Sequence, residues 1–121
     1  MKKVLIVDDS LANLKLARHS LQHASFHVIE AVSGMDGIKK AKRHIPDLIL
    51  MDIQMPGMDG VEAMEMIREM KELAHIPIIA LTASAMQGDK EKLLEKGFNG
   101  YIAKPIVVKS FIEVVSDFCQ S

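Results

Sequence analysis

The sequence predicts an α/β fold in which one parallel sheet of five strands lies between helices on both faces. Over 121 residues, short apolar and β-branched runs alternate five times with segments of helical periodicity, as expected of strands joined by right-handed crossovers. The run from Leu48 to Met51 is apolar throughout, which is typical of a strand buried on both faces of a parallel sheet. No repeat, linker or low-complexity tract interrupts the chain, so we expect a single domain over residues 1–121.

The first half of the chain predicts three strands separated by two helices. Apolar, β-branched runs predict strands at residues 3–7, 26–31 and 48–51. Ser10 or Asp9 is placed to cap the first helix. Its inward face is expected to consist of Leu14, Ala17, Leu21 and Ala24. A shorter helix with a basic outer side follows the Ser33-Gly34 turn, over residues 35–43.

The second half continues the alternation with two strands and three helices. The strands are predicted at residues 78–81 and 100–103, and the helices at residues 61–73, 83–96 and 107–118. The helix at 83–96 is the weakest, because Gly88 costs about 1 kcal/mol relative to alanine inside a helix. Gly97 is placed to end it. For five such units the common solution is the doubly wound, flavodoxin-like strand order 2-1-3-4-5.

Composition and charge argue against several classes of function. A formal net charge of −1 leaves no basic footprint for nucleic acid or for an anionic membrane. The single Cys119 has no partner for an internal disulfide, which suits a reducing compartment. The apolar start at residues 4–7 is too short for a secretory signal, and no run approaches the length of a membrane span. We therefore expect a cytoplasmic protein that contacts neither nucleic acid nor membrane directly.

Polar residues follow four of the five predicted strands. Asp8 and Asp9 follow the first strand, Asp52 the third, Thr82 the fourth and Lys104 the fifth. In the order 2-1-3-4-5 these strands are neighbours, so the five side chains should meet at the carboxyl edge of the sheet, where open α/β sheets bind ligands.

The chemistry of this set indicates phosphoryl transfer. Three neighbouring carboxylates repel one another unless a cation neutralises them, and ligands that are all oxygen suit Mg²⁺. A carboxylate nucleophile at Asp52, an ammonium group at Lys104, a hydroxyl at Thr82 and a metal ion are the parts needed to move a phosphoryl group.

Four motifs occur in a fixed order along the chain: Val7-Asp8-Asp9, the run from Leu50 to Gly60, Ala80-Leu81-Thr82-Ala83, and Tyr101-Ile102-Ala103-Lys104-Pro105. With them the chain resembles, over its full length, the CheY-like receiver domains of two-component response regulators. The stretch from Thr82 to Asp89 is most similar to the DivK type of cell-cycle regulator and to receivers of hybrid kinases. The chain ends soon after its last helix, as in stand-alone regulators and phosphorelay intermediates, or in a receiver excised from a longer protein.

The resemblance implies a role for each site residue. Asp52 would receive a phosphoryl group from a histidine kinase or histidine phosphotransfer protein, with Thr82 and Lys104 on the phosphoryl oxygens. Mg²⁺, or Mn²⁺ in its place, would be held by Asp52, directly by Asp9, mainly through water by Asp8, and by the backbone carbonyl of Gln54.

The family also implies a conformational switch and a signalling output. Tyr101 would turn inward when Thr82 is drawn to the phosphoryl group, and the phosphorylated state would alter the binding of a downstream protein. The peptide bond between Lys104 and Pro105 would be cis. On this interpretation the chain is a signalling module and not an enzyme.

Two other functions share parts of this pattern. A haloacid-dehalogenase-type phosphatase also forms an aspartyl-phosphate with Mg²⁺, but it wants a second Asp where this chain has Gln54, and the chain lacks room for a cap domain. A flavodoxin-like FMN binder would want a phosphate-binding loop where Asp8 and Asp9 stand. His19 and His23 have the i, i+4 spacing of a metal pair, although a solvated helix face is favoured because no Cys or Glu partner accompanies them.

Overall fold

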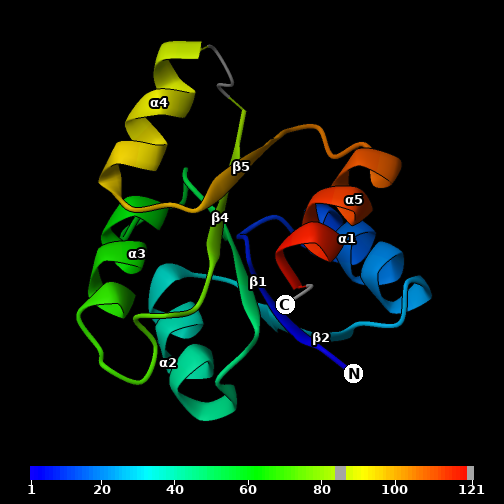
Figure 1. Cartoon of the computed structure of the whole chain (residues 1–121), viewed down its shortest axis with the longest axis horizontal. Coiled ribbons are helices and arrows are strands. Elements are labelled where there is room, and N and C mark those ends of the chain that lie inside the picture. The colour runs from blue at the N-terminus through cyan, green and yellow to red at the C-terminus, as the bar shows by residue number, and fades with distance from the viewer. Residues whose placement is uncertain (84–86, 120–121) are drawn as a thin grey trace.

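The computed structural model describes residues 1–83 and 87–119, which form a five-stranded sheet with five helices (Figure 1). The elements are, in chain order, β1 (Lys3–Val7), α1 (Leu11–His23), β2 (His27–Ala31), α2 (Gly34–His44), β3 (Leu48–Asp52), α3 (Gly60–Arg68), β4 (Ile78–Thr82), α4 (Gln87–Lys96), β5 (Gly100–Ala103) and α5 (Val108–Cys119). All neighbouring strands are parallel and their order is β2-β1-β3-β4-β5. The predicted fold class and strand order are confirmed.

Helices cover both faces of the sheet. Figure 1 shows α1 and α5 on one side of the strands and α2, α3 and α4 on the other. Two hydrophobic clusters fill the spaces between the layers, and successive residues of β1 alternate between them: Leu5 and Val7 join the cluster under α2 and α3, and Val4 and Ile6 the cluster under α1 and α5. This alternation explains why the central strands are apolar without interruption.

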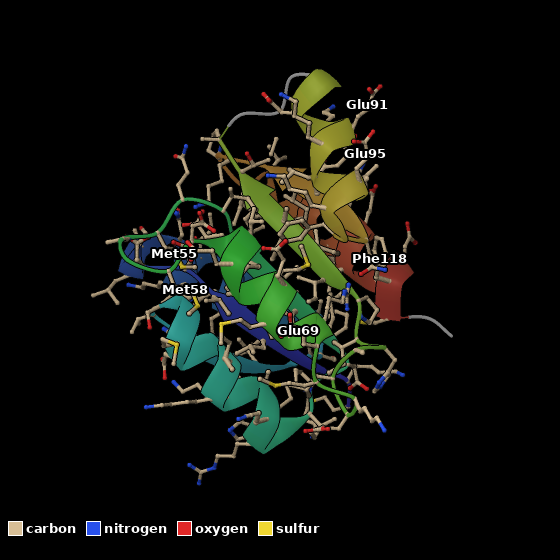
Figure 2. All side chains as sticks on the ribbon, turned by 90° about the vertical axis from the view of Figure 1, so that its left-hand side faces the viewer. Met55, Met58, Glu69, Glu91, Glu95 and Phe118 are labelled. Carbon is tan, nitrogen blue, oxygen red and sulfur yellow. The ribbon has the colours of Figure 1, made fainter. Side chains whose placement is uncertain are left out.

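Capping residues define where the first helices begin. The side chain of Ser10 accepts a hydrogen bond from the backbone N–H of Asn13, so Ser10 rather than Asp9 caps α1. Ser33 caps α2 in the same way. The loop that follows β3 contains Met55 and Met58 (Figure 2) and leads to Asp59, whose side chain forms a capping box with Glu62 at the start of α3.

Two predicted helices are shorter in the structure. The helix predicted at 61–73 ends at Arg68, and residues 69–75 form turns that still bury Leu73. The helix predicted at 83–96 is observed from Gln87, and residues 84–86 lie outside the described part of the chain. The other ends agree with the prediction to within one or two residues.

Arg68, the last residue of α3, bonds to segments that follow the helix. Its guanidinium donates to the carbonyl oxygens of Ala74, Ile76 and Gly97 at 3.2, 2.6 and 3.1 Å, and to the side-chain oxygen of Asn99. That oxygen of Asn99 also accepts the backbone N–H of Ile78 at 2.9 Å. One side chain therefore joins the end of α3 to the starts of β4 and β5.

Candidate functional site

The carboxyl ends of four strands bring the predicted polar residues together. Asp8 follows β1, Asp52 and Thr82 end β3 and β4, and Lys104 follows β5. Carboxylate oxygens of Asp8, Asp9 and Asp52 all lie within 4.8 Å of one another. Among the described residues, no other group of three or more potential metal-binding side chains is found. Asp8, Asp52 and Thr82 are buried, whereas Asp9 is exposed and lies at the opening of the site.

Lys104 lies between two of these carboxylates. Its Nζ is 3.1 Å from Oδ2 of Asp8 and 3.1 Å from Oδ2 of Asp52. The backbone N–H of Lys104 donates to the carbonyl of Thr82 at 2.8 Å, which extends the pairing of β5 with β4 up to the site. The peptide bond that follows, to Pro105, is cis as predicted.

The charges of the site are unbalanced. Burial raises the pKa of Asp52, and the neighbouring Asp8 carboxylate raises it further, although Lys104 and the backbone N–H of Gln54 act in the opposite direction. For Lys104, burial alone would lower the pKa, but the carboxylates of Asp8 and Asp52 outweigh burial and raise it. One ammonium group thus faces three carboxylates, which leaves an excess of negative charge.

The donor atoms of the site fit a small, hard cation. Oδ1 of Asp8 accepts the backbone N–H of Ser10 at 2.9 Å. Oδ2 of Asp8 is buried, and its contact within the described residues is the ion pair with Lys104 Nζ at 3.1 Å. Because Asp52 shares the same ammonium group, the buried carboxylates are not fully neutralised without a further cation. Oxygen-only ligands with one exposed member match the preferences of Mg²⁺, which keeps several of its waters.

The backbone of Gln54 also lies at the site. Its N–H donates to Oδ1 of Asp52 at 3.2 Å, which helps to fix the orientation of that carboxylate. The role expected of its carbonyl oxygen, as a metal ligand, remains a prediction.

Gly60 is a site-positioning residue to which the sequence analysis assigned no role. A Cβ atom on Gly60 would lie 2.1 Å from the carbonyl oxygen of Asp52 and 2.9 Å from the Cα of Ile53. The N–H of Gly60 donates to the carbonyl of Ile53 at 3.1 Å. Only glycine lets α3 begin directly against the turn that carries Asp52. The sequence does contain a feature that indicates this role of Gly60: a glycine stands at the first helical position, directly after the capping residue Asp59.

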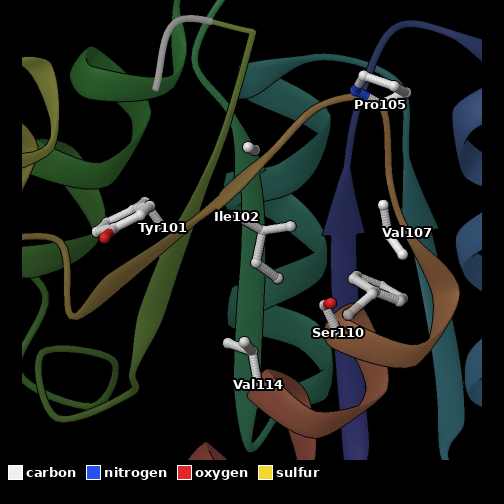
Figure 3. A pocket seen from close by; sticks show the side chains of 8 residues that line it. Tyr101, Ile102, Pro105, Val107, Ser110 and Val114 are labelled. Atoms are coloured by element: carbon white, nitrogen blue, oxygen red, sulfur yellow. The ribbon is translucent and has the colours of Figure 1, made fainter. Parts of the chain in front are cut away.

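Tyr101 lies on the same face of the sheet as Thr82. Ala80 is paired with Tyr101, and Thr82 with Ala103, so Tyr101 and Thr82 stand two residue pairs apart on adjacent strands and on the same face of the sheet. Figure 3 shows Tyr101 and Ile102 on opposite sides of β5. The Tyr101 ring is partly buried against the α2–α3 side cluster, and Nζ of Lys90 lies 4.8 Å from its centroid. The sequence analysis did not predict this contact with Lys90.

The histidine pair on α1 has no metal-site geometry of its own. His19 and His23 are both exposed and line a hollow of about 500 Å³ with Val108 and Ile112 of α5. Neither belongs to a group of three potential ligands within the described residues.

The search for a membrane-spanning segment was negative. Within residues 1–83 and 87–119, no helix has both the length and the apolar character needed to cross a bilayer.

Comparison with known proteins gives matches over nearly the whole chain. The family model for the response regulator receiver domain matches residues 4–116. The polar-differentiation response regulator DivK of Brucella ovis is 43% identical over 117 residues, which cover 97% of this chain and 95% of that protein. DivK of Brucella anthropi is 42% identical with the same coverage.

Solved structures agree with this result. The Vibrio cholerae chemotaxis protein CheY4 superimposes with a TM-score of 0.92 at 30% identity, over 98% of both chains. The receiver domain of the sensor histidine kinase PA1611 from Pseudomonas aeruginosa has a TM-score of 0.90 at 33% identity, over 99% of this chain and 98% of that one. That structure has a magnesium ion coordinated in its active-site cleft.

Proposed function

Because the chain belongs to the response regulator receiver domains, which are phospho-accepting signalling modules, we propose that Asp52 is the residue that takes the phosphoryl group. The observation that carries this proposal is the position of Asp52, buried at the end of β3 with Lys104 Nζ 3.1 Å away and two further carboxylates beside it. Asp8 shares the burial and the contact with Lys104. Asp52 is distinguished from it by its place at the end of the central strand β3, within the motif from Leu50 to Gly60.

The proposed reaction is a displacement at phosphorus. An oxygen of ionised Asp52 forms a bond to the phosphorus of a phosphohistidine, the bond from phosphorus to the imidazole nitrogen breaks, and the bonding electrons stay on that nitrogen. Lys104 neutralises charge on a phosphoryl oxygen, and the Thr82 hydroxyl donates to another. The N–H of Gln54 keeps the Asp52 carboxylate in position.

A Mg²⁺ ion, or Mn²⁺ in its place, belongs to the proposed site. Asp8, Asp9, Asp52 and the carbonyl of Gln54 would hold it. Receiver domains bind Mg²⁺ at an acidic pocket, and the three aspartates here form such a cluster. The bound ion supplies neutralisation of the carboxylates and of the phosphoryl oxygens.

The partners follow from this chemistry. The donor is a histidine kinase or a histidine phosphotransfer protein, and a downstream protein reads the phosphorylated state in the cytoplasm without direct contact to nucleic acid. We propose a regulator that acts in the manner of the DivK proteins, to which the chain is similar. The chain acts as a stoichiometric acceptor rather than a phosphatase, since Gln54 occupies the position where a haloacid-dehalogenase-type enzyme has its acid residue.

The proposal is tested by incubation with acetyl phosphate and Mg²⁺, followed by intact mass measurement. The wild-type protein is expected to gain one phosphoryl mass, and omission of Mg²⁺ is expected to prevent it. Asp52→Asn keeps the shape of the side chain and removes the nucleophile, so it is expected to gain nothing. Equal labelling of this variant would contradict the assignment, and continuous turnover of acetyl phosphate without a labelled intermediate would favour the phosphatase.

A further inference from the structure

Lys90 of α4 contacts Tyr101 of β5 in a way that the phosphoryl chemistry does not use. Nζ of Lys90 lies 4.8 Å from the centroid of the Tyr101 ring, within the range of a cation–π interaction. Both residues are partly buried, and the ring also packs against the α2–α3 side cluster. The ring is therefore held between the core of the domain and the ammonium group above it.

The helix that carries Lys90 is only lightly attached to the domain. Among the described side chains of α4, Leu93 is the only buried one. The main contact of α4 within the described residues is with β5. Figure 2 shows Glu91 and Glu95 on the outer side of this helix. The contact of Lys90 with Tyr101 therefore adds to the packing of Leu93 in holding α4 against the domain.

The surroundings of the ring leave room on more than one side. Lys90, Glu91, Leu94 and Tyr101 line a hollow of about 340 Å³ at the surface. On β4, Thr82 lies on the same face of the sheet as Tyr101, two residue pairs nearer to the site. The structure holds the ring against Lys90, which we call its outward position. If Thr82 moved toward Asp52, volume beside the ring would become free, and the ring could take a second, inward position toward Thr82.

We propose that Lys90 is a latch that holds Tyr101 in the outward position and thereby sets how readily the domain switches when Asp52 is phosphorylated. This inference rests on the proposed phosphorylation of Asp52. The contact exists in only one of the two positions of the ring, so it contributes directly to the equilibrium between them. A cation–π contact at a partly exposed site changes such an equilibrium by about two- to fivefold.

The chain is well suited to a direct test, because Tyr101 is its single tyrosine and it has no tryptophan. With ring-labelled tyrosine, nuclear Overhauser effects to Leu94 report the outward position and those to the Thr82 methyl group the inward one. Lys90→Met keeps the length of the side chain without its charge and is expected to raise the inward-to-outward ratio about two- to fivefold. Lys90→Arg keeps a cation that stacks on the ring and is expected to leave the ratio near that of the wild type.

Lys15→Met is the matched control. Lys15 is exposed on α1, which packs on the other face of the sheet from Tyr101, so the same change of charge there should leave the ratio unaltered. A second measurement is the affinity for beryllofluoride, a phosphoryl mimic, in the presence of Mg²⁺. Lys90→Met is expected to bind it more tightly by the same factor as the shift in the ring equilibrium.

Each contrary result has one meaning. An unchanged ratio in Lys90→Met, or an equal change in Lys15→Met, would refute the latch. A shifted ratio without any change in beryllofluoride affinity would also refute it, because the ring would not be coupled to Asp52. If the wild-type protein itself did not bind beryllofluoride, the proposed function would be rejected instead. The ring ratios of the wild type and of Lys90→Met, both measured without beryllofluoride, would then distinguish this case from failure of the latch.

Discussion

At the scale of single residues, Asp52 is subject to opposing influences on its charge. Burial and the Asp8 carboxylate raise its pKa, whereas Lys104 and the N–H of Gln54 lower it, and the net direction is upward. Without a divalent cation, the folded chain therefore carries an ionised group that is less stable than in the unfolded chain. The ionised form of Asp52, which is the form needed for nucleophilic attack, therefore lowers the free energy of unfolding.

The substitution Asp52→Asn measures this loss of folding stability. As the pH rises from the ordinary carboxyl pKa of 3.8 through the higher pKa of the folded state, the folded protein retains a proton that the unfolded chain has released, so stability falls across this window. Near neutral pH without Mg²⁺, we expect the variant to be more stable than the wild type by roughly 1 kcal/mol, or about 3–5 °C in Tm. The difference should shrink as the pH falls toward 3.8.

Thermal unfolding at several pH values, with and without Mg²⁺, checks this expectation. Addition of Mg²⁺ should stabilise the wild type more than the variant. Asp117→Asn, an exposed position on α5, is the control for loss of one negative charge. An equal gain in that control would show that net charge, and not the environment of Asp52, is responsible.

The two adjacent aspartates should differ in their effect on metal binding. Asp9 is expected to bind Mg²⁺ directly, and Asp8 mainly through water, so Asp8→Asn should weaken binding by about tenfold and Asp9→Asn by more. Titration calorimetry with Mg²⁺ compares the two variants with the wild type. Equal or reversed effects would contradict the distinction between direct and water-mediated ligands.

The position of each site residue could be predicted, but not all of its contacts. Asp8, Asp52, Thr82 and Lys104 stand where apolar runs end, and parallel strands bring such ends to one edge of a sheet. The contact of Lys90 with Tyr101 depends on the rotation of α4 about its axis, which a weakly amphipathic helix does not encode in its apolar pattern.

At the scale of whole elements, the start of α3 depends on Gly60. Because a Cβ there would lie 2.1 Å from the carbonyl of Asp52, Gly60→Ala must displace the helix or the end of β3. We expect a loss of about 2–3 kcal/mol in the free energy of unfolding and slower phosphorylation by acetyl phosphate. Denaturant unfolding and the rate of mass gain measure the two effects.

Gly88→Ala is the matched control for this substitution. A Cβ on Gly88 would meet nothing within 4 Å, and alanine is a better helix former by up to about 1 kcal/mol. We expect this variant to be as stable as the wild type or more so. Similar losses in both variants would show that the close approach at Gly60 is not the cause.

The end of α3 shows why some boundaries could not be read from the sequence. Met70 and Leu73 continue the apolar spacing of the helix, and they are still partly or fully buried in the turns that follow it. After Arg68 the backbone changes to tighter turns, in which Glu69 and Met70 donate to the carbonyls of Met66 and Ile67, and the Arg68 side chain bonds to the segments that precede β4 and β5. Those partners are distant in the sequence, so no local pattern reveals them.

At the scale of the whole molecule, phosphorylation should change the conformation of the face formed by α4, β5 and the start of α5. Thr82 and Tyr101 connect the site to this face through adjacent strands. With Mg²⁺ and beryllofluoride, we expect hydrogen exchange to change in these three elements as well as in the loops around Asp52. The Asp52→Asn protein, treated in the same way, should show no change. Changes limited to the site loops would contradict a signal carried to this face.

The order of the site residues along the chain has a consequence for folding during protein synthesis. Chains emerge from the ribosome with their N-terminus first, so the aspartates at positions 8, 9 and 52 appear well before Lys104, which follows the last strand. An unfinished chain has the acceptor carboxylate but not the ammonium group beside it. If Lys104 is needed for the proposed phosphorylation, the chain can accept a phosphoryl group only after β5 has joined the sheet, when α5 alone remains to be added.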